Sequence, residues 1–316
     1  MRRALALAAI AGAAVTLPLL AQNAKLPQTA PIDPTAALPE TVGIGVDDSR
    51  MTVPVSIGAS GPYRFIIDTG SERTVVSREL AGTLNLAAGR RVKVTTMTGR
   101  GELATFLLPA LRVSLVSPDT LEAPAVSAAN LGAPGMLGID ALKGHAVAID
   151  FDRNLMEVRP AKKRRASAGP DDIVIRAKNL YGQLIVTDAQ YRGRRISVVI
   201  DTGSAVTIGN LALLKRVRTE KSLGQIGLMS VTGQWLRADY RVIDSLSIAG
   251  IEFKGVPIGF ADALPFKRFG LTDTPALMLG MDTLKLFRRV QIDFANREIR
   301  LTLPRDVRVD PAVRFQ

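Results

Sequence analysis

Two carboxylates occupy equivalent places in two copies of one motif. Asp68 follows the apolar run 65–67 and precedes Thr-Gly-Ser, and Asp201 follows the run 198–200 and precedes the same three residues. A run of β-favouring apolar residues followed by such a turn predicts a strand that ends in a tight loop, in which glycine permits a close backbone approach. The sequence therefore places one acid at the end of each of two core strands.

Other groups that could perform hydrolysis are scarce. The 316 residues include no cysteine and one histidine, His145. This composition excludes disulfides, thiolate catalysis and cysteine-based zinc sites, and it disfavours a Ser-His-Asp triad. We expect no metal, no cofactor and a structural role for His145, so the hydrolytic chemistry falls to carboxylates.

The similarity between the two halves of the chain extends beyond the acidic motif. The offset between matching residues is 133 to 134 positions at first and 142 later, for the pairs Asp68/Asp201, Gly99/Gly233 and Gly138/Gly280. The change indicates one insertion of about eight residues, which we place within 261–275. The period is far too long for a solenoid, so the pattern indicates a tandem duplication of a β-rich unit.

Each half contains the strands that would position its acid. Alternation of apolar and polar residues predicts a hairpin of 51–57 with 63–67, which carries Asp68, and a second hairpin of 91–96 with 102–108. The corresponding segments of the second half are 183–189, 196–200 and a glycine-containing tip at 229–235. Two β-rich lobes of the same design are therefore expected.

Composition also divides the chain. A basic run at 162–165 among Ser, Gly and Pro is typical of a linker. The predicted segments are a signal peptide or N-terminal anchor (1–24), an extended lead-in (25–44), a first lobe (45–160), a linker (161–174), a second lobe (175–304) and a C-terminal tail (305–316).

The N-terminus is typical of a secretory signal, because two arginines precede the apolar run 4–21. This predicts export to the periplasm or the medium. An uncleaved membrane tether through 4–21 is the alternative, since a run of about 18 residues is at the lower limit for spanning a bilayer. Pro18 interrupts the run, and both alternatives leave the chemistry of the lobes unchanged.

The chain is strongly basic, with a net charge of +12. The basic residues are scattered and aromatic residues make up only 5% of the chain. This pattern indicates a solvated cationic surface and no nucleic-acid partner.

Three motifs recur in the same order in both halves: an apolar strand entering Asp-Thr-Gly-Ser, a glycine-tipped hairpin, and an apolar-apolar-Gly segment. Together they resemble the aspartic proteases over roughly residues 45–303. One unit resembles a retropepsin, while two units in one chain are arranged as in pepsin. The resemblance implies an all-β fold of two homologous acid-protease lobes, closed and barrel-like with short helices, related by a pseudo-twofold axis.

The resemblance also implies roles for the residues around the two acids. Asp68 and Asp201 would meet at the axis as the catalytic pair. The supporting residues would be the threonines that link the loops (Thr69, Thr202), the glycines whose N–H groups hold the carboxylates (Gly70, Gly203), the serines whose hydroxyls bind the outer carboxylate oxygens (Ser71, Ser204), and the segments beneath the loops (Leu137, Gly138, Leu279, Gly280). We expect Asp140 and Asp282 to cap short helices.

Both halves offer a flap over the substrate. The flap residues would be Thr98, Gly99 and Gly101 in the first half and Thr232, Gly233 and Trp235 in the second. Neither flap contains a tyrosine, which favours a two-flapped, retropepsin-like cleft over the single flap of pepsin. Trp235 is expected either to cover the substrate or to be partly buried by packing.

The resemblance implies an aspartic endopeptidase that binds a protein or peptide in extended form. Two adjacent carboxyls cannot both ionise cheaply, so the pair holds one proton, a behaviour known for aspartic proteases in general. The alternative is a catalytically silent peptide-binding or regulatory protein of the same fold. The short linker favours a monomer with intramolecular lobe pairing over pairing of lobes between chains.

Overall fold

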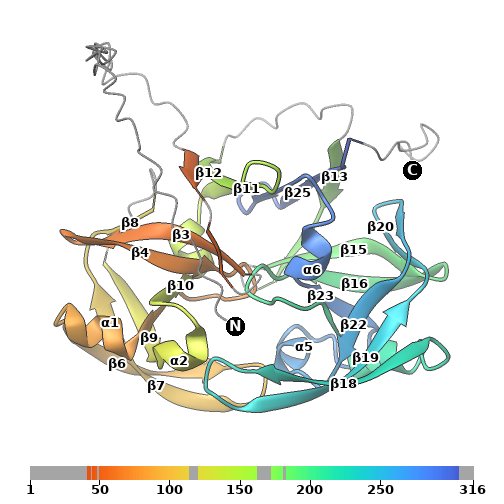
Figure 1. The fold of residues 1–316 in the computed structure, drawn as a ribbon, viewed down its shortest axis with the longest axis horizontal. Helices are drawn as coiled ribbons and strands as arrows, with labels where there is room; N and C mark the ends of the chain where they lie inside the picture. Colours follow the sequence, from red (N-terminus) through yellow and green to blue (C-terminus); the bar gives the residue numbers. More distant parts are fainter. Residues whose placement is uncertain are drawn as a thin grey trace, which may run out of the picture. The chain divides into compact units, whose positions relative to one another are not determined.

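The computed structural model describes residues 41–43, 45–47, 50–113, 120–161, 172–180 and 183–305, which form mostly β-strands (Figure 1). The predicted signal or anchor, most of the lead-in, the basic run of the linker and the C-terminal tail after residue 305 lie outside the described residues. Within those described ranges, no helix is both long enough and apolar enough to cross a membrane.

The first half forms a curled sheet with the strand order β2-β3-β4-β10-β5-β9-β7-β6, and β8 pairs with β3. The strands are β2 (Gly45–Asp47), β3 (Arg50–Ile57), β4 (Ser60–Ile67), β5 (Val75–Ser77), β6 (Ala88–Thr95), β7 (Arg100–Leu108), β8 (Leu111–Arg112), β9 (Leu121–Val126) and β10 (Gly135–Leu137). The helices of this half are α1 (Arg78–Thr83), α2 (Ala128–Leu131) and α3 (Ile139–Leu142).

The second half forms a sheet with the order β18-β19-β22-β17-β23-β16-β15-β20-β21, and β14 pairs with β15. Its strands are β14 (Lys178–Leu180), β15 (Gln183–Tyr191), β16 (Arg194–Ile200), β17 (Ile208–Gly209), β18 (Lys221–Met229), β19 (Trp235–Ile243), β20 (Leu246–Ile248), β21 (Ile251–Phe253), β22 (Val256–Phe260) and β23 (Ala276–Leu279). The helices are α4 (Leu211–Leu214), α5 (Leu264–Arg268) and α6 (Met281–Leu284).

The duplicated sequence builds a duplicated topology. The path β4-β10-β5-β9-β7-β6 of the first half recurs as β16-β23-β17-β22-β19-β18 in the second. In each half the strand before the acid pairs in parallel with the apolar-apolar-Gly strand, at Ile67 opposite Leu137 and at Ile200 opposite Leu279. All four of these side chains are buried, which explains why these strands are continuously apolar. The predicted all-β fold of two equivalent lobes is confirmed.

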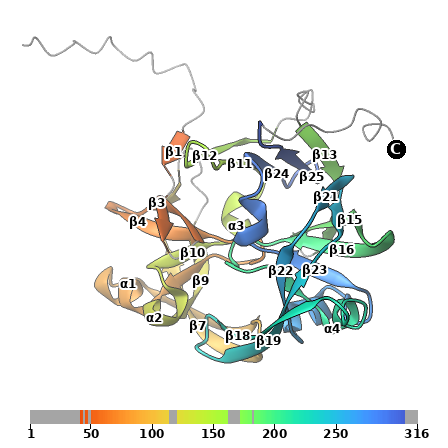
Figure 2. The ribbon, with the colours of Figure 1, turned by 45° about the vertical axis from the view of Figure 1, so that its right-hand side comes forward.

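A six-stranded sheet joins the halves, in the order β1-β12-β11-β24-β25-β13 (Figure 2). Its strands are β1 (Thr41–Gly43), β11 (His145–Asp150), β12 (Leu155–Pro160), β13 (Asp172–Arg176), β24 (Arg289–Asp293) and β25 (Glu298–Thr302). At its centre β11 and β24 are antiparallel, with Val147 opposite Ile292, and both side chains are buried. One chain therefore supplies both halves of this sheet.

The ends of two predicted segments belong to this sheet. β1 lies within the range predicted as lead-in and pairs with β12. β13 begins at Asp172, inside the range predicted as linker, and pairs with β25. β1 and β13 are the edge strands of this sheet, and they pair the backbone groups of β12 and β25 that would otherwise be exposed.

Candidate active site

Asp68 and Asp201 follow directly after β4 and β16, and the two Asp-Thr-Gly loops lie against each other. A Cβ atom added to Gly203 would lie 2.2 Å from Cγ of Asp68, and one added to Gly70 would lie 2.7 Å from Oδ1 of Asp201. Each carboxyl is therefore seated on the backbone of the opposite loop, where only glycine leaves room. The two carboxyls are close enough that the charge of Asp201 raises the pKa of Asp68.

Thr69 and Thr202 hold the two loops together. The Thr69 hydroxyl donates to the Ile200 carbonyl at 3.0 Å, and the Thr202 hydroxyl donates to the Ile67 carbonyl at 2.9 Å. Each hydroxyl also accepts the backbone N–H of the other threonine, at 3.1 and 3.2 Å. Because both threonines are almost fully buried, these bonds are shielded from competition with water.

We expect Thr202→Val to destabilise the protein by roughly 2 to 4 kcal/mol, because it leaves the Thr69 N–H and the Ile67 carbonyl buried without these partners. Urea unfolding followed by circular dichroism measures the change. Thr83→Val is the matched control, since Thr83 is exposed and its hydroxyl bonds only within α1. Equal effects of the two substitutions would mean that the threonine bonds do not hold the loops.

The inner oxygens of the carboxyls accept backbone N–H groups. Gly70 donates to Oδ1 of Asp68 at 2.7 Å, and Gly203 donates to Oδ1 of Asp201 at 3.1 Å. The backbone N–H groups of Ser71 and Ser204 lower the pKa of their own loop's carboxyl, and the Ser71 N–H donates to the backbone carbonyl of Asp68 at 3.4 Å.

The serine hydroxyls differ from their expected role. That of Ser71 donates to the Arg73 carbonyl at 2.8 Å, and that of Ser204 donates to the Val206 carbonyl at 2.7 Å. A hydroxyl has one proton to donate, and here it closes the turn two residues ahead. The hydroxyls of the two serines therefore stabilise the loops and do not bind the carboxyls.

The environment of the two carboxyls favours a single bound proton. Burial raises the pKa of Asp68 well above its ordinary value, and the charge of Asp201 raises it further. Burial also raises the pKa of Asp201, although hydrogen bonds from Gly203, Ser204 and Asp68 lower it. Because both pKa values are raised and the two carboxyls interact, the pair holds one proton between its members.

The raised pKa of Asp68 predicts how stability depends on pH. Because the pKa of Asp68 is raised in the folded protein, the folded state binds the proton more tightly, and the resulting stabilisation is lost as the pH rises through the folded pKa. Asp68→Asn removes the titrating group. We expect the substitution to raise the Tm by a few degrees at pH 7 and not at pH 3, as measured by thermal unfolding. A gain of the same size at both pH values would contradict a raised pKa.

The apolar-apolar-Gly segments lie directly beneath the loops. The Leu137 carbonyl accepts the N–H of Asp68 at 2.9 Å, and the Leu279 carbonyl accepts the N–H of Asp201 at 3.0 Å. A Cβ on Gly138 would lie 2.3 Å from the backbone of Arg73, and one on Gly280 would lie 2.5 Å from that of Val206. These glycines let the supporting segment pass under each loop.

Asp140 and Asp282 brace the segment that follows each loop. Oδ1 of Asp140 accepts the N–H and hydroxyl of Thr74 at 2.8 and 2.7 Å, and Asp282 binds Thr207 in the same way. The expectation that these aspartates are N-caps is wrong, because Gly138 and Gly280 occupy the caps. The sequence contained a signal for the bracing pairs, since a threonine follows each loop aspartate by six positions.

Gln183 makes a contact with the first Asp-Thr-Gly loop that the sequence did not predict. It begins β15 in the second half, and its side-chain amide donates to the Gly70 carbonyl in the first loop. Gln183 begins the repeated segment 183–189, but the matching segment of the first half begins with Met51, so the repeat gave no signal for a polar contact here.

The two predicted flaps are the β6–β7 hairpin, with its tip at 96–99, and the β18–β19 hairpin, with its tip at 230–234. Thr98, Gly99, Thr232 and Gly233 lie in these tips. Gly101 and Trp235 do not, because Gly101 pairs with Val94 inside one hairpin and Trp235 pairs with Met229 inside the other. The tips are shorter than predicted because the strands continue to pair almost to the turn.

The tips of the two hairpins meet, and each packs on the opposite half (Figure 1). The Thr98 hydroxyl donates to the side chain of Gln234 at 2.8 Å. Met97 packs on an apolar cluster of the second half, and Val231 packs on one of the first half. The hairpins are therefore joined to each other and to both lobes.

Trp235 is 68% exposed. Its neighbour Leu236 is partly buried against the second half's apolar cluster, so Trp235 lies on the other face of the strand, with its ring next to Gly227. The expectation of a partly buried packing residue is wrong. The expectation that Trp235 covers the substrate gains no support from this outward face.

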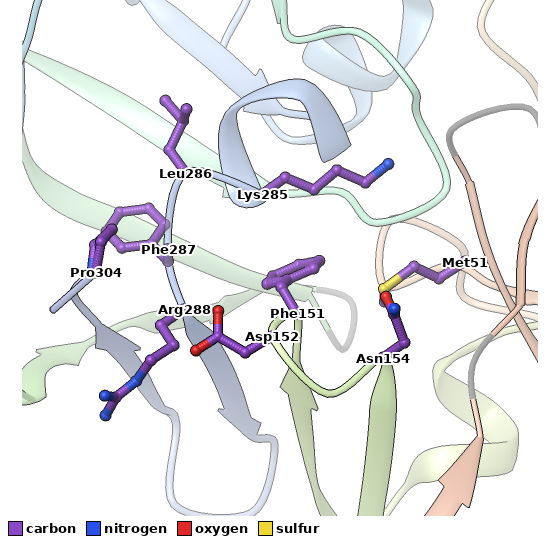
Figure 3. A pocket seen from close by; sticks show the side chains of 9 residues that line it. All are labelled: Met51, Phe151, Asp152, Asn154, Lys285, Leu286, Phe287, Arg288 and Pro304. Atoms are coloured by element: carbon purple, nitrogen blue, oxygen red, sulfur yellow. The ribbon is translucent and has the colours of Figure 1, made fainter.

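Two surface pockets lie away from the acids. One of about 410 Å³ is lined by Met51, Phe151, Asp152, Asn154, Lys285, Leu286, Phe287, Arg288 and Pro304 (Figure 3). The other, of about 450 Å³, lies beside α4 and includes Asp262 and Asp273. Neither includes Asp68 or Asp201. Among the described residues, no three His, Asp or Glu side chains are grouped so that they could hold a metal ion.

The fold and the paired loops define the class of acid proteases built from two equivalent lobes. Comparison with family models agrees: residues 53–144 match "gag-polyprotein putative aspartyl protease", and residues 187–283 match "Aspartyl protease". The chain belongs to the aspartyl protease family and contains two retropepsin-like units in tandem. A search of curated proteins finds no match to this chain.

Proposed function

We propose that this protein is an active aspartic endopeptidase that hydrolyses peptide bonds with a water molecule activated between Asp68 and Asp201. The observation that carries the proposal is the pair of adjacent carboxyls, each held by its own loop and seated on the opposite one. A peptide would bind in extended form between this pair and the two hairpin tips.

We assign the shared proton to Asp68, because burial and the charge of Asp201 both raise its pKa. Asp201 is the general base, which takes a proton from the water as its oxygen attacks the peptide carbonyl carbon. Asp68 is the general acid, which gives its proton to the carbonyl oxygen. In the second step Asp201 gives its new proton to the leaving nitrogen, Asp68 regains a proton from the hydroxyl of the tetrahedral intermediate, and the C–N bond breaks. The pair returns to its starting state without a metal, cofactor or covalent intermediate.

A catalytically silent peptide-binding protein is the alternative. The supporting bonds around both acids favour the enzyme, because a binding module has no need of two carboxyls that share a proton. We further propose that the protein acts as a monomer, since one chain contributes both loops and both sides of the six-stranded sheet. Export, with or without a tether through 4–21, is proposed from the sequence alone.

Cleavage of casein by residues 25–316, measured from pH 3 to pH 8 with and without pepstatin, tests the proposal. We expect pepstatin-sensitive cleavage that declines at higher pH, where Asp68 loses its proton. A folded protein that binds peptides but cleaves none at any pH would favour the silent alternative.

A further inference from the structure

The two halves differ most between the strand that ends at Phe260 and the one that begins at Ala276. This connection, residues 261–275, contains α5 and is seven residues longer than its counterpart, residues 127–134, which contains α2. The path of six strands from β4 to β6 recurs in the second half from β16 to β18. Because only the second half contains the insertion, the two sides of the candidate active site are not equivalent.

The inserted segment contacts the flap hairpin of the other half. The N–H of Leu264 donates to the Met97 carbonyl, in the tip of the β6–β7 hairpin, at 3.1 Å. The Met97 side chain packs on the cluster that includes Ala263 and Phe266. The segment therefore holds the first hairpin tip through both backbone and side chain.

The same segment also contacts the first Asp-Thr-Gly loop. Nε and Nη2 of Arg268 donate to the two carboxylate oxygens of Glu72, each at 2.7 Å. Glu72 follows Ser71, four positions after Asp68. A two-pronged bond between guanidinium and carboxylate fixes orientation as well as distance. The inserted segment is thus connected both to the tip of the first hairpin and to the loop that carries Asp68.

Among the described residues, no hydrogen bond or ion pair joins the α2 segment to the second Asp-Thr-Gly loop in this way. The position equivalent to Glu72 is Ala205, which has no charged side chain. The side chain of Asn130 in α2 lies close to Gly233 of the second hairpin tip. The observed contact of α2 is therefore with the hairpin and not with the Asp-Thr-Gly loop.

We propose that the α5 segment, braced by Arg268 and Glu72, closes one end of the peptide site. This inference rests on the proposed function. A bound peptide in extended form advances about 3.3 Å per residue. Within a few residues it would reach the α5 segment, which connects the first hairpin tip to the first Asp-Thr-Gly loop. The preferred substrates would then be peptides with few residues on the α5 side of the reacting bond and a longer chain on the α2 side.

A series of peptides tests this inference. Starting from a peptide that the enzyme cleaves, single residues are added to or removed from each end, and kcat/KM is measured. We expect extension on one side to lower kcat/KM at least tenfold and extension on the other side to have little effect. Arg268→Ala and Glu72→Ala should each relieve that one-sided penalty at least fivefold, and the double variant should add nothing further.

Arg289→Ala is the matched control. Arg289 pairs with Glu157 of the other half at 2.7 Å and is 38% exposed, against 39% for Arg268. Its pair lies in the six-stranded sheet, so its loss should leave the length profile unchanged. Equal length tolerance on both sides, or the same change in both arginine variants, would overturn the inference.

Binding of the same peptides to Asp201→Asn protein, by fluorescence anisotropy, separates the two proposals. A one-sided length penalty in binding, relieved by Arg268→Ala, would uphold the closed end even if the wild type cleaved nothing. In that case only the proposed function would fail. Absence of binding by every peptide would overturn both.

Discussion

Asp201→Asn should abolish proteolysis, with kcat lowered about 10³-fold or more, because general acid–base catalysis contributes 10² to 10⁴-fold. The asparagine has the same shape and can still accept the N–H of Gly203, but it cannot take a proton from water. Asp68→Asn should be equally damaging, because it removes the proton that Asp68 donates. Casein cleavage measures both variants.

Asp150→Asn is the control for these substitutions. Asp150 ends β11 and accepts the N–H of Arg153 at 3.0 Å, a bond that asparagine can keep. Its activity should match that of the wild type. If Asp201→Asn kept more than a tenth of the activity while folded, another group would have to activate the water.

Gly203→Ala should be nearly as damaging as loss of an acid. The new methyl group would lie 2.2 Å from Cγ of Asp68, so the Asp68 carboxyl or the loop must move. A displacement of about 1 Å costs on the order of 10² in rate, and the crowding costs roughly 1 to 3 kcal/mol of stability. Cleavage assays and urea unfolding measure the two effects.

Gly82→Ala serves as the comparison. A Cβ at Gly82 would meet nothing within 4 Å, and the residue lies in α1. Alanine should be neutral or slightly stabilising there, because it favours helix more than glycine does. Wild-type activity in Gly203→Ala would show that the loops do not approach as closely as the structure indicates.

The parts of the site that could be predicted from the sequence are those whose motifs occur in both halves of the chain. The offset of 133 positions between Asp68 and Asp201, with matching apolar strands, indicated the two lobes, and the paired sheets have that arrangement. Repetition allowed each half to support the interpretation of the other. The positions of the two acids therefore needed no structure to be proposed.

Local details were less predictable because several conformations suit the same residues. Gly99 and Gly101 flank Arg100, and composition does not reveal that pairing of β6 with β7 places only Gly99 at the tip. The hydroxyl of Ser71 could serve a carboxylate or a carbonyl, and the choice depends on the turn. Sequence alone leaves such alternatives open.

Contacts between distant, unrepeated residues could not be predicted. Arg268 and Glu72 are 196 positions apart, and neither belongs to a repeated motif. Their pairing depends on the place where the folded lobes bring α5 against the first loop. The change in offset located the insertion, but it could not show that the inserted segment contacts Glu72.

The most direct test of the paired-aspartate account is to mix the Asp68→Asn and Asp201→Asn variants. It asks whether both aspartates of the catalytic pair come from the same chain. Wild type, Asp68→Asn, Asp201→Asn and an equimolar mixture of the two variants are incubated with casein, and the products are identified by mass spectrometry. Cleavage by the wild type alone, with both variants and their mixture inactive, is the predicted result. Activity in the mixture would show that lobes of different chains combine, and cleavage by either folded variant alone would contradict the paired-aspartate account.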